Sequence, residues 1–157
     1  MIHGKFFAAN DSEVQKCFDI RMAVFVDEQG YKKEDEFDEV DKYAMFAAVY
    51  DDDGKMVGTG RCFIDDDGVY HAGRIAVLKE ARGKKYGDFL VRMLCDRAFA
   101  NGAQEVHIGA QVRAAGFYEK IGFVKAGEEY NDCHVPHVPM ILKKNAFCSQ
   151  CGCVYDK

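Results

Sequence analysis

Residues 74–87 read RIAVLKEARGKKYG, which joins a strand-forming run, a short loop rich in glycine and basic residues, and the start of a helix. At the start of a helix the first backbone N–H groups have no intrahelical partners, and the helix dipole adds partial positive charge there. These two effects favour the binding of a phosphate or pyrophosphate group. The segment therefore predicts a strand–loop–helix unit that can hold an anionic ligand.

The loop itself supplies the residue types that such a site needs. Gly83 and Gly87 allow the backbone to approach a ligand closely, and Arg82, Lys84 and Lys85 add mobile positive charge. The loop is neither a Walker A loop nor a Rossmann fingerprint, because G-x-x-x-x-G-K-[ST] and G-x-G-x-x-G are both absent. Taken alone, the loop can equally be a surface turn with solvated basic side chains.

Three consecutive antiparallel strands are expected before this unit. Asp-Gly turns at residues 51–54 and 65–68 separate apolar runs at 43–50, 55–64 and 69–78. An Asp-Gly pair between two strand-like runs is a strong hairpin signal.

After these strands the hydrophobic pattern changes to the helical period, which predicts a helix over residues 86–100. The other expected elements are a strand over 2–9, a helix over 12–26, a charged loop or short helix over 31–42 that could lie over a site, a strand over 105–110, a short helix over 112–121, and strands over 123–130 and 138–143. The order β-α-β-β-β-α-β-α-β-β predicts a mixed α/β domain with a crossover helix.

A second informative segment, residues 111–123, reads QVRAAGFYEKIGF. Phe117 and Tyr118 lie near the end of the short helix, and Gly122 and Phe123 follow it directly. On packing grounds alone, Phe117 would lie in the core and the Tyr118 hydroxyl would point outward.

The length and composition of the chain are typical of one globular domain. The chain has 157 residues, of which 48% are hydrophobic and 30% charged, which suffices for a packed core. The net charge of −5 argues against nucleic-acid binding and is compatible with a cationic substrate, although solubility explains it most simply. No run is apolar enough to cross a membrane and no signal peptide is evident, so we expect a cytoplasmic protein.

The seven cysteines form two groups. Four are dispersed and are expected to be reduced and mostly buried: Cys17, Cys62, Cys95 and Cys133. Three cluster near the C-terminus: Cys148, Cys151 and Cys153. These three could bind Zn²⁺ as thiolates if His134, His137 or a second chain supplied a fourth ligand. We favour a reduced tail without metal.

Together the two segments resemble the GNAT family of N-acetyltransferases. The phosphate loop of that family reads R/Q-x-x-G-x-G/A, and its later signature reads F-Y-x-x-x-G-F. Arg82 and Gly87 match the first and last loop positions, and Lys85 stands where the broad family has glycine. The second signature is matched by Phe117, Tyr118, Gly122 and Phe123.

The resemblance is closest to the ElaA-like branch and spans roughly residues 5–143. The branch shares the lysine in the phosphate loop, so Lys85 casts little doubt on cofactor binding. Its other features here are VFVDEQ at 24–29, GAQ at 109–111 and VPHVPM at 135–140.

The resemblance implies a central, mostly antiparallel, twisted sheet that is split in a V and flanked by helices. It implies a GNAT domain over residues 1–145 and a flexible cysteine-rich tail over 146–157. The implied activity is transfer of the acetyl group of acetyl-CoA to a primary amine of a small molecule or peptide. No metal is required, and the protein could be a monomer or a homodimer.

The resemblance also implies the cofactor site. The pantetheine arm pairs with the strand at Ile75–Val77, and the pyrophosphate lies on the backbone N–H groups of residues 82–87. The implied cofactor-binding residues are Ile75, Ala76, Val77, Arg82, Gly83, Lys84, Lys85, Tyr86, Gly87, Gln111, Phe117 and Tyr118.

For catalysis, the resemblance implies that a strand N–H near Val77 stabilises the oxyanion and that Tyr118 is the acid for the CoA sulfur. Glu28 and His137 are candidates for the base, and a water could relay the proton instead. Glu28 could also shape the acceptor pocket. His107 is expected to be structural. The alternative function is a non-catalytic acyl-CoA-binding module on the same fold, and the retained tyrosine and phosphate loop argue against it.

Overall fold

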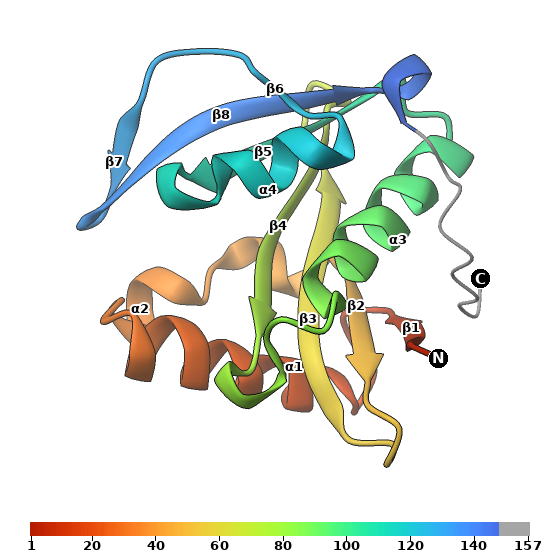
Figure 1. The fold of residues 1–157 in the computed structure, drawn as a ribbon, viewed down its shortest axis with the longest axis vertical. Coiled ribbons are helices and arrows are strands. Elements are labelled where there is room, and N and C mark those ends of the chain that lie inside the picture. Colours follow the sequence, from red (N-terminus) through yellow and green to blue (C-terminus); the bar gives the residue numbers. More distant parts are fainter. Residues whose placement is uncertain (148–157) are drawn as a thin grey trace.

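The computed structural model describes residues 1–147, so Cys148, Cys151 and Cys153 lie outside the described residues. Within this range, strands pair in the order β1-β2-β3-β4-β5-β8-β6, and β7 also pairs with β8 (Figure 1). The strands are β1 His3–Phe7, β2 Met45–Tyr50, β3 Met56–Ile64, β4 Tyr70–Val77, β5 Glu105–Gln111, β6 Val124–Lys125, β7 Tyr130–Asp132 and β8 Val135–Lys143.

Over residues 1–147, four α-helices accompany the sheet: α1 Val14–Arg21, α2 Lys33–Glu36, α3 Tyr86–Ala100 and α4 Ala115–Ile121. A π-helical segment, Met22–Glu28, continues α1. Short 3-10 turns occur at Glu39–Lys42, Lys79–Ala81, Val112–Ala114 and Lys144–Ala146. No helix within residues 1–147 combines the length and the apolar character that crossing a membrane requires.

The predicted mixed α/β fold with a mostly antiparallel sheet is confirmed. The β4–β5 ladder is parallel and the other ladders in the described chain are antiparallel. The helix predicted over 86–100 has those bounds, and the Asp-Gly turns close their hairpins through Asp51 and Asp65. In each turn the aspartate side chain accepts hydrogen bonds from backbone N–H groups two and four residues later. Because these bonds are local, the turn can be predicted from a few consecutive residues.

The strand predicted over 123–130 is wrong as one element, because it is divided into β6 and β7. Both pair with β8, which begins at Val135 rather than at the predicted residue 138. Ala126 donates its N–H to the Pro139 carbonyl at 2.8 Å, so Pro139 faces this edge without an N–H of its own. Because this donor is missing, pairing with β8 is interrupted after β6 and resumes only at β7.

The helix predicted over 12–26 also differs, because only Val14–Arg21 is α-helical. The chain then widens into π-helical geometry, with Gln29 donating to the Val24 carbonyl at 3.1 Å. Wide turns of this kind are uncommon and occur often at functional sites. Here the wide turn brings Glu28 and Gln29 to the edge of the sheet that carries the candidate site.

The sheet has a core on each face. In β2, Ala47 and Val49 belong to the apolar cluster that contains the buried side of α3, whereas Phe46 and Ala48 belong to the cluster that contains the buried side of α1. This is the two-residue alternation of a strand that is covered on both sides.

β4 and β5 separate soon after they meet. They are paired only at Tyr70↔Val106 and His71↔His107. Beyond that point β4 continues in the ladder with β3, and β5 continues with β8 as far as Gln111↔His137. In Figure 1, β5, β8 and α4 accordingly form an upper part of the molecule and α1 and α2 a lower part. The separation is the V-shaped split that the resemblance implied.

The tight packing around Gly58 of β3 leads to a prediction about stability. A Cβ there would lie 2.9 Å from Val49 Cγ2 and 3.2 Å from the Ala76 carbonyl oxygen. We expect Gly58→Ala to lower the free energy of unfolding by about 1–3 kcal/mol, because the strand and its neighbours must move apart.

The matched control is Gly73→Ala on the adjacent strand, where an added Cβ meets nothing within 4 Å. It should stay within about 0.5 kcal/mol of the parent protein. Urea unfolding of the three proteins measures both values. Equal unfolding midpoints for Gly58→Ala and Gly73→Ala would contradict the packing argument.

Candidate active site

A cavity of about 340 Å³ lies between the separated ends of β4 and β5. Gly73, Arg74 and Ile75 line it from β4, and Ile108 and Gly109 line it from β5. Further lining residues come from α2, α4 and the β7–β8 hairpin: Asp35, Glu36, Tyr118, Asp132 and His137. The cavity is therefore built from elements that are distant in the sequence.

A bulge in β4 forms part of the cavity wall. β3 advances by two residues, from Arg61 to Thr59, while β4 advances by three, from Gly73 to Ala76. The extra residue places Arg74 at a φ of 52°, in the left-handed region that a non-glycine residue rarely adopts. Such a conformation costs about 1–3 kcal/mol and persists only where other contacts hold it.

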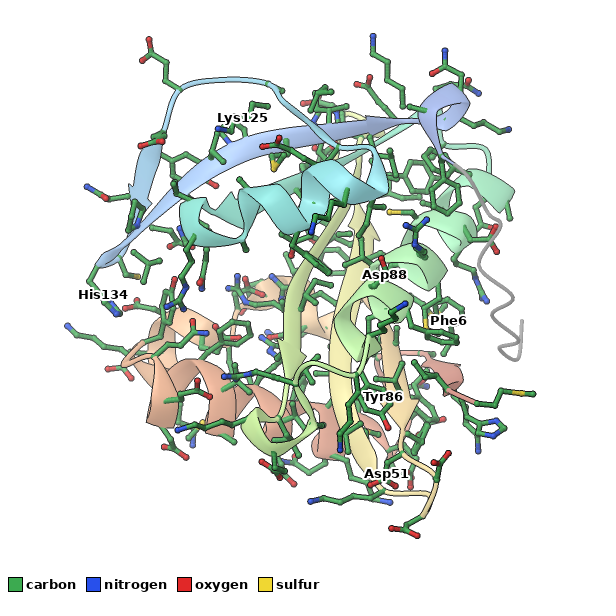
Figure 2. All side chains as sticks on the ribbon, viewed as in Figure 1. Phe6, Asp51, Tyr86, Asp88, Lys125 and His134 are labelled. Atoms are coloured by element: carbon green, nitrogen blue, oxygen red, sulfur yellow. The ribbon has the colours of Figure 1, made fainter. Side chains whose placement is uncertain are left out.

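The loop before α3 has the geometry expected of an anion site. Gly83 and Lys85 have φ values of 81° and 68°, and the α-helix begins at Tyr86, labelled in Figure 2. The first helical bond runs from the Phe89 N–H to the Lys85 carbonyl at 3.1 Å. The backbone N–H groups of the turn before Phe89 consequently have no helical partners. Lys84 and Lys85 are exposed beside them.

Gly87 is not required by the packing of the fold. A Cβ at this position would lie 3.6 Å from Phe117 Cζ and 3.9 Å from Val77 Cγ2, which are ordinary contacts. Leaving this position without a side chain instead keeps the start of α3 open on the side of Phe117 and Val77. Phe117, Val77 and the start of α3, which the resemblance implied as cofactor-binding residues, thus lie close together.

Arg82 does not add mobile charge, which corrects the sequence interpretation. Its Nη1 and Nη2 donate to the two carboxylate oxygens of Glu28 at 2.6 and 2.7 Å, and its Nε donates to the Val77 carbonyl at 3.0 Å. The paired guanidinium lowers the pKa of Glu28 below its usual value. An ionised carboxylate held by both oxygens is poorly suited to take a proton, and Glu28 is not among the cavity-lining residues.

The neighbouring Gln29 reaches the other arm of the V. Gln29 Oε1 accepts a hydrogen bond from Gln111 Nε2 at 2.8 Å, and Gln111 Oε1 accepts one from Arg113 Nε at 2.8 Å. Glu28 and Gln29 therefore tie the end of the π-helical segment to the loop after β4 and to the end of β5. Sequence reasoning included Gln111 and missed Gln29, although Gln29 lies in the VFVDEQ segment that carries part of the family resemblance.

Tyr118 is buried, and only 7% of its surface is exposed. Its ring packs edge-on against Phe117 and Phe123, and the residue lines the cavity. The alternative in which Phe117 is the core residue and the Tyr118 hydroxyl points to solvent is wrong, because Phe117 is the more exposed of the two. Burial raises the pKa of the Tyr118 hydroxyl well above its usual value, so the phenol stays protonated.

His137 is buried beside the cavity, with 6% of its surface exposed. Its Nδ1 lies 2.9 Å from the Val135 carbonyl, which can only accept, so the neutral ring carries its proton on Nδ1. Nε2 is then an unprotonated acceptor, 3.9 Å from Asp132 Oδ2. His107, in contrast, bonds to Glu105 at 2.8 Å and does not line the cavity.

Sequence reasoning missed a cluster of paired, mostly buried charges in and beside the cavity wall. Arg21, which is 1% exposed, contacts Glu36 at 2.9 Å and Asp41 at 2.7 Å. Arg61 contacts Asp38 and Asp41, each at 2.7 Å. The sequence feature that could have indicated the cluster is the close spacing of Glu36, Asp38 and Asp41 in the charged segment 31–42. That segment otherwise resembles a solvated loop.

Arg74 joins this cluster from the β4 bulge. Its Nε lies 3.2 Å from both the Glu36 carbonyl and Glu36 Oε1, and its Nη2 lies 3.4 Å from Asp38. These contacts hold the strained residue and fix α2 against the cavity. Burial raises the pKa of Glu36, while the guanidinium groups of Arg74 and Arg21 act in the opposite direction.

Within residues 1–147, no group of three or more His, Cys, Asp or Glu side chains is arranged to hold a metal ion. Cys17, Cys62 and Cys95 are buried free thiols as expected, whereas Cys133 is exposed. His134, labelled in Figure 2, bonds through Nε2 to the Gln29 carbonyl at 2.8 Å.

Comparison with known proteins places this geometry in a family. Residues 9–144 match the family model described as "Acetyltransferase (GNAT) domain". A curated relative, the "Uncharacterized N-acetyltransferase YjcF" of Bacillus subtilis, is 35% identical over 135 residues, which cover 85% of this chain and 95% of that protein.

Two solved structures share the fold. One is the crystal structure of Escherichia coli ElaA, with a TM-score of 0.81, 26% identity, and coverage of 91% of this chain and 100% of that one. The other is a structure described as a putative N-acetyltransferase from Lactobacillus plantarum, with a TM-score of 0.81, 27% identity, and coverage of 90% and 97%. Because the family model matches residues 9–144 and the Bacillus subtilis relative is 35% identical over most of both chains, the chain belongs to the GNAT acetyltransferase family.

Proposed function

We propose that the protein is an N-acetyltransferase that moves the acetyl group of acetyl-CoA directly to a primary amine of a small molecule or peptide. The observation that carries the proposal is the cleft between β4 and β5, at which an unpaired strand edge and the Tyr118 side chain meet beside an open helix start. The four described cysteines are free thiols, which suits a reducing compartment such as the cytoplasm.

The free edge of β4 suits the pantetheine arm. Leu78 donates its N–H to the Val57 carbonyl of β3 at 2.9 Å. Because N–H directions alternate along a strand, the Val77 N–H points away from β3 and toward the gap. We propose that Ile75, Ala76 and Val77 pair with the amides of the arm, and that the Val77 N–H donates to the acetyl oxygen as it becomes negative.

The helix-start loop suits the pyrophosphate. Its backbone N–H groups carry the partial charge of the α3 dipole, and the exposed Lys84 and Lys85 add two full charges. Gly83 supplies the positive φ and Gly87 the open surface. Phe117 and Gln111 would flank the arm where it enters the cleft, next to Tyr86 and Arg82.

The reaction needs no covalent intermediate on the protein. The amine nitrogen attacks the acetyl carbonyl carbon and forms the C–N bond, after which the C–S bond breaks and the sulfur leaves with the electron pair. The nitrogen loses a proton to a base, and the sulfur leaves as a thiolate that a hydrogen-bond donor stabilises and that takes a proton from solvent after it departs.

Tyr118 is proposed as the donor to the departing sulfur. A thiolate with an ordinary pKa near 8.5 is less basic than a buried phenolate, so the full transfer from Tyr118 is uphill. The hydroxyl therefore acts chiefly by donating a hydrogen bond that stabilises the negative sulfur as the bond breaks. The surrounding rings hold it in place for that role.

His137 is proposed as the base. The Val135 carbonyl holds its Nδ1 proton, which leaves the Nε2 lone pair for the amine proton. Glu28 is proposed as a positioning residue, because its carboxylate orients Arg82 and so holds the loop that comes after β4.

The alternative, a non-catalytic acyl-CoA-binding module, requires the cofactor cleft and leaves Tyr118 and His137 without a role. Both side chains line the same cavity from opposite elements, which favours the enzyme. Calorimetric titration with acetyl-CoA and CoA, followed by thiol release against a panel of amines, separates the two. Binding without release for every amine supports the module, and no binding would refute both.

The first prediction concerns Tyr118. We expect Tyr118→Phe to reduce kcat by about 10²-fold, the lower end of what positioned proton donation contributes, with little change in the dissociation constant of acetyl-CoA. Thiol release and calorimetry measure the two quantities. Tyr43→Phe, at an exposed site, is the control, and unchanged kcat in Tyr118→Phe would remove Tyr118 as donor.

A second prediction tests the helix-start loop. We expect Gly87→Val to weaken acetyl-CoA binding about tenfold or more, because the branched side chain covers the backbone at the start of α3. Gly87→Ala should bind acetyl-CoA like the parent, since its single methyl group meets only ordinary contacts. Calorimetry checks both variants, and parent-like binding by Gly87→Val would show that the pyrophosphate lies elsewhere.

A third prediction separates the two histidines on adjacent strands. His137→Gln should lower kcat by about 10²-fold, because the proton acceptor is lost, and should leave acetyl-CoA affinity in place. His107→Gln, whose ring does not line the cavity, should retain activity. Melting temperatures confirm that both variants are folded. If His137→Gln kept as much activity as His107→Gln, a water molecule rather than His137 would have to take the proton.

A further inference from the structure

We infer that the acceptor is a small amine that carries a second positive charge, as a linear diamine does, and that Glu36, Asp35 and Asp132 bind its non-reacting ammonium group. The inference rests on the proposed acetyl transfer, since the acceptor would occupy the cavity between β4 and β5.

Glu36 provides the first observation. It lines the cavity although it is only 3% exposed. Its Oε1 accepts from Arg21 Nε at 2.9 Å and lies 3.2 Å from Arg74 Nε, whereas Oε2 has no hydrogen-bond partner among the described residues. The only fully buried side-chain polar atom without a partner in that range is Arg61 Nε. Oε2 is therefore not fully buried, and it belongs to a side chain that lines the cavity.

Charge balance provides the second observation. The cluster at the cavity wall contains three guanidinium groups, of Arg21, Arg61 and Arg74, and three carboxylates, of Glu36, Asp38 and Asp41, so the charges of the cluster cancel. Asp35 and Asp132 line the cavity in addition, and no guanidinium or ammonium group of the described chain lies within ion-pair distance of Asp35. The cavity is therefore net negative when its histidines are neutral.

Asp35 of α2 and Asp132 of β7 lie on the same side of the cavity, although they are distant in the sequence. The Sγ atom of Cys133 lies 3.8 Å from Asp35 Oδ2, and Asp132 immediately precedes Cys133. Cys133 has a φ of 56° in the tight turn that joins β7 to β8, and this turn brings the hairpin tip, with Asp132, to Asp35 of α2. Carboxylates from two elements thus converge on one part of the cavity wall.

The reacting amine does not by itself account for these carboxylates. It must be neutral when it attacks, so a carboxylate that held it as an ammonium ion would oppose the reaction. A second, non-reacting ammonium group keeps its charge throughout, and its attraction to Glu36 Oε2, Asp35 and Asp132 persists in the transition state. A carboxylate on the acceptor would instead be repelled, because Arg61 and Arg74 are already paired.

The test compares three acceptors with the same four-carbon chain: 1,4-diaminobutane, n-butylamine and 4-aminobutanoate. With acetyl-CoA and the full-length protein, we expect kcat/KM for thiol release to be about tenfold higher for the diamine than for butylamine, and lowest for 4-aminobutanoate. Calorimetry of the CoA-bound protein should detect the diamine and show weakening at high salt.

Two variants assign the effect. Asp35→Asn and Asp132→Asn should each lower the ratio of kcat/KM for diamine over butylamine by several-fold, and each should weaken diamine binding to the CoA complex. Glu34→Gln removes an exposed charge from the same helix outside the cavity and should leave the ratio unchanged. Glu36→Gln disturbs a buried ion pair and can unfold the protein, so the two aspartates are the decisive positions.

The outcomes separate this inference from the proposed function. Thiol release with equal efficiency for diamine and butylamine, or ratios that the two aspartate variants leave unchanged, overturns the diamine class and leaves acetyl transfer standing. Failure of the protein to bind acetyl-CoA, or to release thiol with any amine, refutes the proposed function and the inference with it.

Discussion

Backbone pairing between β4 and β5 lasts for only two residue pairs, Tyr70↔Val106 and His71↔His107, and the arrangement of the site depends on the separation of the two strands beyond them. Each strand keeps one partner, so the sheet stays intact while the facing edges separate. The gap leaves backbone donors such as the Val77 N–H without a strand partner and creates the cavity. A continuous ladder would use these groups and leave no room for a ligand arm.

The bulge at Arg74 forms the wall of the gap, and buried charges hold it. Burying ionised groups is costly, so a cluster of this kind gives little net stability. Removing one member leaves its partner uncompensated, which costs about 3–5 kcal/mol. The cluster therefore fixes position: it holds α2, the bulge and the neighbouring β3 in one relative arrangement beside the cavity.

The end of the π-helical segment acts on both arms of the split sheet. Glu28 holds Arg82 after β4, and Gln29 holds Gln111 at the end of β5. Because an α-helical continuation would place these side chains at a different angle, the wide turn is what directs the adjacent residues to opposite arms. The spacing of the arms, and with it the width of the cleft, is thus set in part by side chains outside the sheet.

The sequence by itself determined most of the helices and strands and the likeness to a family. Asp-Gly turns, the helical period of residues 86–100 and the glycine-rich loop act over a few residues, so their patterns were readable without a fold. Tertiary structure decided the partners: Arg82 pairs with Glu28 at a separation of 54 residues, and Gln29 pairs with Gln111 at 82. It also decided that Tyr118 is buried, that Glu36 faces a cavity and that Pro139 divides the predicted strand. These outcomes depend on which distant groups the folded chain brings together, and local propensity contains no information about such pairs.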